Sequence, residues 1–149
     1  MHIRAYRRSD LQTLYAIDQA CFPPGVSYSK SEISRFIARR GSRTWVAEVA
    51  DEIVGFLIAG RESKDAGHIV TIDVVQDWRR KGVGRALMDA AEAWALEQGM
   101  RLLYLETAEE NLTAQRFYEA RNYSKFEKVE RYYADGAAAW VMVKTMGGE

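Results

Sequence analysis

The chain has 149 residues, 48% of them hydrophobic, which is enough to bury a full core, and no break in composition marks a linker. Basic and acidic residues each total 21, so the formal net charge is zero, which disfavours broad electrostatic attraction to nucleic acid or to an anionic membrane. One cysteine cannot form an internal disulfide, and no set of cysteine and histidine residues has the spacing of a metal site. Neither a signal-peptide pattern nor a membrane-spanning apolar run is present. We therefore expect a single domain over residues 1–149, with no metal, in the cytoplasm.

The first forty residues predict one strand and two helices. His2–Tyr6 is expected to form the strand, because charged and apolar residues alternate there. Two pairs have the spacing of a capping box, which predicts the start of a helix. They are Ser9 with Gln12, for a helix to about Cys21, and Ser29 with Glu32, for a helix to about Arg40.

Three strands are predicted next. Residues 43–49 and 53–61 alternate in polarity on either side of a short turn, which predicts a hairpin. The stretch 69–75 is short and β-branched and is bounded by Gly67 and Gln76, so it is expected to form a largely buried strand.

A turn rich in glycine and basic residues follows this strand and leads into an amphipathic helix that ends near Gly99. Gly82 and Gly84 lie in the turn, where the first helical amides have no partner within the helix and the missing Cβ atoms let an anion approach. Four basic residues add positive charge there: Arg79, Arg80, Lys81 and Arg85. The lysine and hydroxyl of a P-loop are missing, so the segment predicts a diphosphate site without ATP hydrolysis, or else only a tight turn beside a solvated basic surface.

The last third of the chain predicts a strand, a helix and two more strands. Residues 102–106 form the strand, and Asn111 is the expected N-cap of a short helix ending at Asn122, a residue type that tolerates the left-handed conformation. Strands are expected near 123–132 and 138–145. The order β-αα-βββ-α-β-α-ββ predicts an α/β fold, in which a mixed sheet of about seven strands has helices on both faces.

Three motifs, in this order, resemble the acetyl-CoA-dependent N-acetyltransferases of the GNAT superfamily. They are Arg79-x-x-Gly82-x-Gly84, a Leu-x-Leu-Glu106 strand, and Asn111-x-x-Ala114-x-x-Phe117-Tyr118. The resemblance covers nearly the whole chain and implies that strands four and five splay apart to admit the pantetheine arm of acetyl-CoA. The residues that it implies for binding acetyl-CoA are Asp73, Val74, Val75, Arg79, Arg80, Lys81, Gly82, Val83, Gly84, Arg85 and Asn111. Asn111 could instead only cap its helix.

Two further matches resemble the RimI-like protein N-terminal acetyltransferases, which act on ribosomal proteins. They are a loop over residues 20–29, containing Phe22-Pro23 and Tyr28-Ser29, and a segment over 131–136, containing Tyr132-Tyr133 and Asp135-Gly136. Tyr28, Tyr132 and Tyr133 could therefore line the acceptor groove, with ordinary packing as the alternative. Glu110 in place of serine, Asn122-Tyr123 in place of Gly-Phe and the longer Phe-Pro loop depart from the RimI-like pattern and leave the acceptor open.

Acetyl transfer to an amine needs a neutral nucleophile, a partner for the carbonyl oxygen as it gains charge, and a proton donor for the departing thiolate. Tyr118 is the candidate donor, because a phenol of pKa about 10 is protonated at pH 7 and the resemblance places a tyrosine beside the sulfur. Glu106 is the candidate general base through its match to the RimI-like enzymes. A main-chain N–H near Val74 or Val75 could hold the oxygen. The alternatives are aromatic packing for Tyr118 and a solvated surface charge for Glu106.

The residues therefore predict an N-acetyltransferase that moves acetyl from acetyl-CoA to a primary amine by direct attack. The leading acceptor is the α-amine of a protein or peptide N-terminus. A small-molecule amine and a non-catalytic acyl-CoA-binding sensor are the alternatives, and no nucleic-acid or membrane partner is expected. Cys21 is expected in the core, and neither His2 nor His68 has a sequence pattern that supports a catalytic role.

Overall fold

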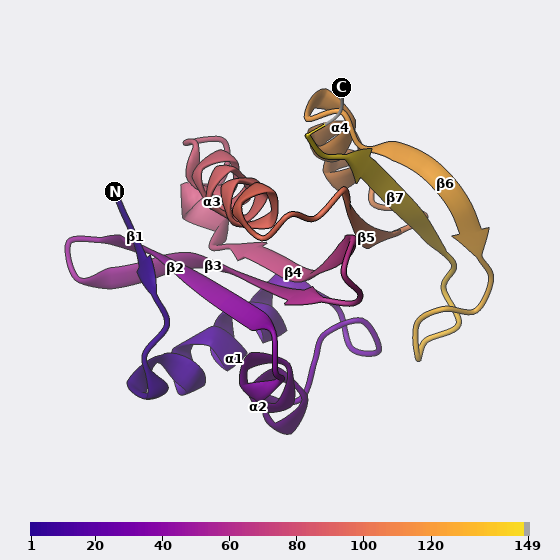
Figure 1. Cartoon of the computed structure of the whole chain (residues 1–149). Coiled ribbons are helices and arrows are strands. Elements are labelled where there is room, and N and C mark those ends of the chain that lie inside the picture. Colours follow the sequence, from indigo (N-terminus) through magenta and orange to yellow (C-terminus); the bar gives the residue numbers. More distant parts are fainter. Residues whose placement is uncertain (148–149) are drawn as a thin grey trace.

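Within residues 1–147, which the computed structural model describes, the chain forms one seven-stranded sheet in the order β1-β2-β3-β4-β5-β7-β6 (Figure 1). The strands are β1 (His2–Ala5), β2 (Ser42–Val49), β3 (Glu52–Arg61), β4 (Ala66–Val74), β5 (Leu102–Ala108), β6 (Ser124–Val129) and β7 (Ala139–Thr145). The helices are α1 (Leu11–Cys21), α2 (Lys30–Ala38), α3 (Val83–Glu97) and α4 (Leu112–Ala120), with 3₁₀ turns η1 (Arg8–Asp10) and η2 (Gln76–Trp78). Neighbouring strands are antiparallel except β4 and β5, which confirms the predicted mixed sheet.

Helices cover both faces of the sheet. Helices α1 and α2 pack below strands β1 to β4 in Figure 1, and α3 and α4 lie on the opposite face. Each face has its own apolar core. One core lies between the sheet and helices α1 and α2 and is centred on Leu14, Ile33 and Phe56, and the other lies between the sheet and α3 and includes Leu57 and Leu87. The two cores account for the largely apolar β3, whose side chains are buried on both faces.

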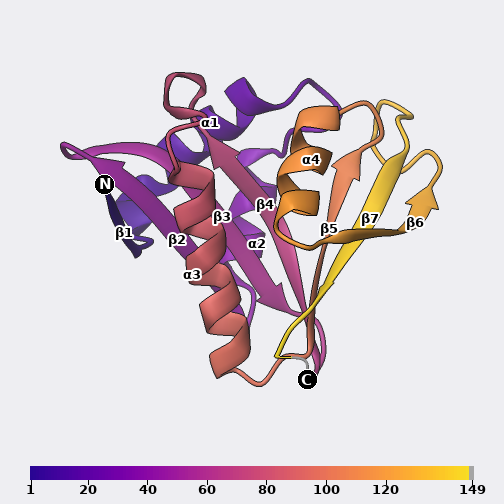
Figure 2. The ribbon, with the colours of Figure 1, turned by 90° about the horizontal axis from the view of Figure 1, so that it is seen from above.

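Strands β4 and β5 are paired over only a short length. Their parallel register covers Ala66 with Leu102, Gly67 with Leu103 and His68 with Tyr104. Beyond these pairs β4 continues to Val74 and β5 to Ala108, and Figure 2 shows the two strands diverging toward the first turn of α4. The predicted splay between the fourth and fifth strands is confirmed. It leaves main-chain groups of both strands facing an opening instead of each other.

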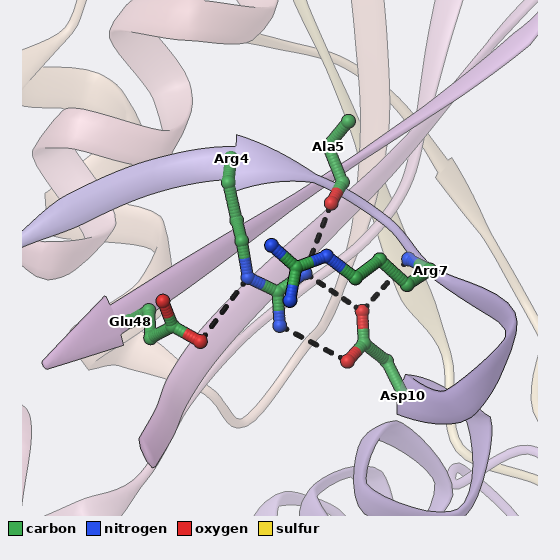
Figure 3. A network of polar contacts seen from close by, with 5 residues as sticks. All are labelled: Arg4, Ala5, Arg7, Asp10 and Glu48. Atoms are coloured by element: carbon green, nitrogen blue, oxygen red, sulfur yellow. Dashed lines mark hydrogen bonds and ion pairs between the residues drawn. The ribbon is translucent and has the colours of Figure 1, made fainter. Parts of the chain in front are cut away.

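The start of α1 differs from the capping box predicted at Ser9. The chain first makes the turn η1, and the carboxylate of Asp10 accepts hydrogen bonds from the main-chain N–H of Arg7 at 2.8 Å and from both terminal nitrogens of Arg4 at 2.9 and 3.0 Å (Figure 3). Arg4 also donates to Glu48 on β2 at 3.2 Å. Ser9 lies inside the turn, so the polar residue that organises this helix start is Asp10.

The other predicted helix signals are confirmed. The Ser29 hydroxyl accepts from the N–H of Glu32 at 3.1 Å, and the Glu32 carboxylate accepts from the N–H of Ser29 at 2.8 Å, which completes the capping box of α2. The side chain of Asn111 accepts from the N–H of Ala114 at 3.1 Å at the start of α4. Asn122 has a φ of 74° just after that helix, in the left-handed region.

Two strand ends also differ from the prediction. Strand β4 begins at Ala66, three residues before the expected start, because it pairs with both β3 and β5 there. Strand β6 ends at Val129 instead of residue 132, and residues 130–138 form a loop in which the N–H groups of Tyr132 and Tyr133 both donate to the carbonyl of Ala137. None of the helices in the described part of the chain is long and apolar enough to cross a membrane.

Candidate active site

A cleft of about 1050 Å³ opens where β4 and β5 separate. Its walls come from the α1–α2 loop, the ends of β4 and β5, the starts of α3 and α4, and the β6–β7 loop. It brings together most of the predicted site residues: Tyr28, Asp73, Val74, Arg79, Arg80, Gly82, Gly84, Arg85, Glu106, Asn111, Tyr118, Tyr132 and Tyr133. The chain thus places five separate sequence motifs around one opening.

Three of the residues predicted to bind acetyl-CoA lie outside the lining of this cleft: Val75, Lys81 and Val83. Val83 is 1% exposed and packs in the apolar core, because it faces the sheet from the first turn of α3. The Lys81 ammonium lies 5.0 Å from the centre of the Trp78 ring, an arrangement typical of a cation–π contact.

The start of α3 forms one end of the cleft. Gly82 is the N-cap with a φ of 88°, a backbone conformation that glycine adopts without steric cost, and its carbonyl accepts from the N–H of Ala86 at 3.0 Å. The next main-chain N–H groups have no partner within the helix, and the helix dipole adds partial positive charge to them. Arg80 and Arg85 line the same end. This geometry suits a diphosphate or another multiply charged anion.

Arg79 has a structural contact in addition to its place in the lining. Its Nε donates to the main-chain carbonyl of Val74 at 3.0 Å, and the thiol of Cys21 lies 3.5 Å from the same oxygen. The side chain therefore joins the end of β4 to the basic turn. Part of the positive charge of the four basic residues in this turn is thus held at the edge of the opening.

The main chain at the end of β4 distinguishes the two predicted oxyanion donors. The N–H of Val75 donates to the carbonyl of Val54 on β3 at 2.9 Å, so it is already engaged. In an antiparallel ladder the groups of alternate residues point to opposite sides, and the N–H of Val74 accordingly points away from β3 toward the opening. Val74 is therefore the better placed of the two.

Glu106 lies on β5 in the cleft, and its Oε1 is 2.7 Å from Nε2 of His68 on β4. Both side chains are mostly buried, at 14% and 17% exposed, and the His68 ring stacks on Tyr104 at 4.5 Å between ring centres. No sequence pattern pointed to His68, because 38 residues separate it from Glu106. The parallel register of β4 and β5 brings the two side chains together, and no local sequence pattern predicts that register.

Three tyrosines meet near Glu106 at the other end of the cleft. Tyr28 comes from the α1–α2 loop, and Tyr132 and Tyr133 come from the β6–β7 loop, with their two rings 4.8 Å apart. Burial, followed by the charge of Glu106, raises the pKa of Tyr132 to about 12. The two loops touch, since the N–H of Ala134 donates to the carbonyl of Gly25 at 3.1 Å.

Tyr118 on α4 lies deeper in the cleft and is 7% exposed. Its ring packs edge-on against Phe117 and Tyr123, with centres 5.2 and 5.8 Å away. Burial raises the pKa of its phenol well above the ordinary value. The hydroxyl therefore keeps its proton throughout the neutral range and is a hydrogen-bond donor in this environment.

Asn111 lines the cleft and also caps α4, so the helix contact that the sequence left as an alternative is present. Cys21 is half-buried at the edge of the cleft instead of fully in the core, and burial raises the pKa of its thiol. A thiol with a raised pKa is a poor nucleophile at neutral pH. No cluster of three or more possible metal ligands occurs among the described residues.

Together these groups can perform an acyl transfer to an amine. A helix start that suits an anion, a strand N–H that points toward the opening, a buried phenol and a carboxylate paired with a histidine all belong to this cleft. The tyrosine-lined end is open to a second molecule, and its neighbouring carboxylate can accept a proton from an incoming amine.

Comparison with known proteins agrees with this chemistry. The model of the Acetyltransferase (GNAT) family matches residues 11–123. The chain is 26% identical to the N-alpha-acetyltransferase of Saccharolobus solfataricus, with 97% of this chain and 92% of that protein covered. Among solved structures, Ard1 from Thermoplasma volcanium has a TM-score of 0.90 at 28% identity, with 99% of this chain and 98% of that chain covered. The ribosomal-protein-S18-alanine N-acetyltransferase from Escherichia coli has a similar fold, with a TM-score of 0.86 at 24% identity over 99% and 96% of the two chains.

Proposed function

Since the chain belongs to the acetyltransferase (GNAT) family, and is an acetyl-CoA-dependent N-acetyltransferase, we propose that its acceptor is the α-amine at the N-terminus of a protein or peptide. The resemblance to GNAT enzymes in the sequence is confirmed by the family match. The observation that supports the acceptor proposal most directly is the open end of the cleft, where three tyrosines surround Glu106. The name of the Saccharolobus solfataricus relative points to the same acceptor class.

Acetyl-CoA would be held along the cleft by groups already described. The N–H groups at the start of α3, with Arg80 and Arg85, would bind the diphosphate. The opening beside Val74 would take the pantetheine arm and present the thioester near Tyr118. Neither Lys81 nor Val83 is assigned a side-chain contact with the ligand, because neither lines the cleft.

In the proposed reaction the neutral amine attacks the thioester carbonyl carbon directly. A C–N bond forms, the C–S bond breaks, and the amine proton passes to Glu106, which His68 holds in place at 2.7 Å. The N–H of Val74 stabilises the carbonyl oxygen while it gains negative charge. CoA leaves as a thiolate, and the Tyr118 hydroxyl donates a hydrogen bond to it.

The raised pKa of Tyr118 refines this last role. A thiol has a reference pKa of about 8.5, whereas an unperturbed phenol has one of about 10 and that of Tyr118 lies higher. Complete proton transfer from Tyr118 to the thiolate is therefore unfavourable. Tyr118 acts best as a fixed hydrogen-bond donor that stabilises the charge on sulfur. The proton that the amine loses is taken up by Glu106 and not by the thiolate.

The choice of acceptor agrees with the strength of the base. At pH 7, forming the neutral amine from an α-ammonium of reference pKa about 7.8 costs about 1.1 kcal/mol, whereas the same step for lysine, at about 10.4, costs about 4.6 kcal/mol. A carboxylate is a weak base, so it is better matched to the first of these amines.

An acceptor survey tests the proposal. We expect kcat/KM for short peptides with free N-termini to exceed that for polyamines and free amino acids. Tyr132→Ala should raise the peptide KM about tenfold while leaving the acetyl-CoA KM within about twofold, because an interface tyrosine contributes on the order of 1 kcal/mol or more. Phe126→Ala, which changes an exposed side chain on β6, is the matched control. A small amine that is acetylated as efficiently as the peptides would contradict the proposal.

A further inference from the structure

Two buried carboxyl groups face each other beside the cleft and have no role in the reaction described above. Asp18 on α1 is completely buried, and Asp73 on β4 is 1% exposed. After burial, Asp18 is the strongest influence on the Asp73 carboxyl, although the two residues come from different elements, 55 positions apart in the chain. Helix α1 packs against the end of β4 here, where the Cys21 thiol lies 3.5 Å from the carbonyl of Val74. Asp73 also lines the cleft, so the pair lies between the reaction site and the core beneath α1.

The hydrogen bonds of these carboxyl groups leave one oxygen of each without a partner. Oδ2 of Asp18 accepts from the main-chain N–H of Tyr28 at 2.7 Å, and Oδ1 of Asp73 accepts from the hydroxyl of Thr71 at 2.5 Å. The other two oxygens, Oδ1 of Asp18 and Oδ2 of Asp73, are buried and have no donor within the described residues. Two ionised carboxylates in contact would repel each other and leave both oxygens unsatisfied. One shared proton removes the repulsion and satisfies both.

The surroundings favour a proton on Asp73. Burial, followed by the effect of the neighbouring Asp18 carboxyl, raises the pKa of Asp73 well above its ordinary value. Four other titratable or charged groups face the pair. These are Cys21 on α1, Tyr28 in the following loop, Arg79 after β4 and Tyr118 on α4. Of these only the Arg79 guanidinium favours ionised Asp73, and it is already bonded to the carbonyl of Val74.

Asp18 connects this proton to the acceptor end of the cleft. The carbonyl of Tyr28 accepts from the side chain of Gln19 at 2.7 Å, and its N–H donates to Asp18, so both main-chain groups of Tyr28 are held by successive residues of α1. A proton on Asp73 fixes the Asp18 carboxylate in turn against β4. The loop that contains Tyr28 is therefore linked through Asp18 to β4, the strand that would lie beside the thioester.

We propose that Asp18 and Asp73 share a single proton and form a positioning pair, which holds Tyr28 at the acceptor groove and keeps a second negative charge away from the reacting atoms. This inference rests on the proposed function for its effect on acceptor binding, but the shared proton itself does not. Loss of the proton places two like charges in contact beneath Tyr28 and adds a negative charge near Tyr118, where the thiolate must form.

The shared proton can be measured directly by infrared difference spectroscopy on the purified protein. We expect a protonated carboxyl band at pH 7 that disappears only as the pH is raised into the alkaline range. The band should be absent in Asp73→Asn and shifted in Asp18→Asn, whose side-chain oxygen can still accept from Tyr28. Asp51→Asn is the matched control, because Asp51 is exposed in the β2–β3 turn and asparagine tolerates its left-handed φ of 66°. Two ionised carboxylates at pH 7 in the wild-type protein would overturn the proposal.

The kinetic consequence is a pH-dependent KM for the acceptor. We take the ratio of the acceptor KM of the wild-type protein to that of Asp73→Asn, because the ionisation of the amine affects both values equally and cancels. This ratio should rise about tenfold as the pair loses its proton, since about one charge-assisted hydrogen bond to the Tyr28 loop is weakened. The same ratio for acetyl-CoA should change less. A ratio that stays flat from neutral to alkaline pH would contradict the positioning role. If no peptide is acetylated at all, the infrared result still decides whether the proton is shared.

Discussion

Tyr118 has a single polar atom to contribute at the bottom of the cleft, and its ring has structural contacts that phenylalanine would keep. Tyr118→Phe should therefore lower kcat about 100-fold, because the departing thiolate loses its hydrogen-bond donor. The KM for acetyl-CoA should stay within about twofold, since the ground-state thioester sulfur is uncharged. Steady-state kinetics with a peptide acceptor measures both values. An unchanged kcat would remove Tyr118 from the reaction.

Glu106 and His68 give a second prediction at the scale of single residues. Glu106→Gln should lower kcat/KM for the acceptor about 100-fold, because an amide cannot accept the amine proton. His68→Gln should have a smaller effect, about tenfold, since it removes only the group that holds Glu106 in place. The affinity for acetyl-CoA, measured by calorimetric titration, serves as the internal control for both variants. A larger loss in His68→Gln than in Glu106→Gln would assign the proton acceptor to the histidine instead.

Residues with a local signal were predictable, and those defined by distant pairing were not. Asn111 and Asn122 were selected because capping and left-handed positions depend on nearby main chain, and both occupy those conformations. His68 and the Asp18–Asp73 contact depend on strand register and on the packing of α1 against β4. No short stretch of sequence encodes either of them.

At the scale of elements, the start of α3 is the feature on which acetyl-CoA binding depends. A Cβ added at Gly84 would lie 3.4 Å from the Phe117 ring, so a longer side chain has to extend into the cleft. Gly84→Glu should weaken acetyl-CoA binding at least 100-fold through bulk and through repulsion of the diphosphate. Gly84→Gln, of the same size but neutral, should weaken it less. Equal affinities for the two variants in a calorimetric titration would place the diphosphate elsewhere.

The N-terminal strand depends on the ion pair of Arg4 with Asp10, which lies between β1 and η1 (Figure 3). The side chains are 8% and 7% exposed, so Asp10→Asn leaves a buried guanidinium whose remaining anionic partner among residues 1–147 is Glu48. We expect this change to reduce the free energy of unfolding by about 3 kcal/mol near neutral pH, as measured by urea titration.

The effect of Asp10 on stability should also depend on pH. Its hydrogen bond to Arg4 lowers the pKa of the carboxyl in the folded protein, against a smaller opposing effect of burial. The stabilisation is therefore present above the unfolded-state pKa of about 3.9 and is lost as the pH falls through the lower folded-state value. The difference in unfolding free energy between wild type and Asp10→Asn should shrink below about pH 4. A difference that is constant down to the lowest accessible pH would contradict this account.

Helix boundaries illustrate which elements a sequence can define. The Ser29–Glu32 box was correct because each side chain accepts from the main-chain N–H of the other, whereas the Ser9–Gln12 spacing was misleading because Asp10, bound to Arg4, organises that turn. Strand β6 was predicted three residues too long, since the aromatic Tyr132 and Tyr133 favour strand by propensity but belong to the loop at the cleft. In both cases a tertiary contact outweighed a local preference.

At the scale of the whole molecule, the alternation of elements was enough to predict a mixed sheet with helices on both faces. The position of the splay was not derivable from local patterns and came from the resemblance to GNAT enzymes. Physically it follows from the three-residue pairing of β4 with β5, beyond which the two strands diverge (Figure 2). The cleft exists because the sheet separates there, so fold and site are inseparable in this protein.

The most direct test of the proposed function uses one peptide that has both a free N-terminal α-amine and an internal lysine. The protein is incubated with acetyl-CoA and this peptide, CoA release is followed, and the acetylated atom is located by tandem mass spectrometry. A second peptide with a blocked N-terminus is the control. The account predicts acetyl on the α-amine of the first peptide and no product from the second. Acetylation of the lysine, at similar rates in both peptides, would contradict it.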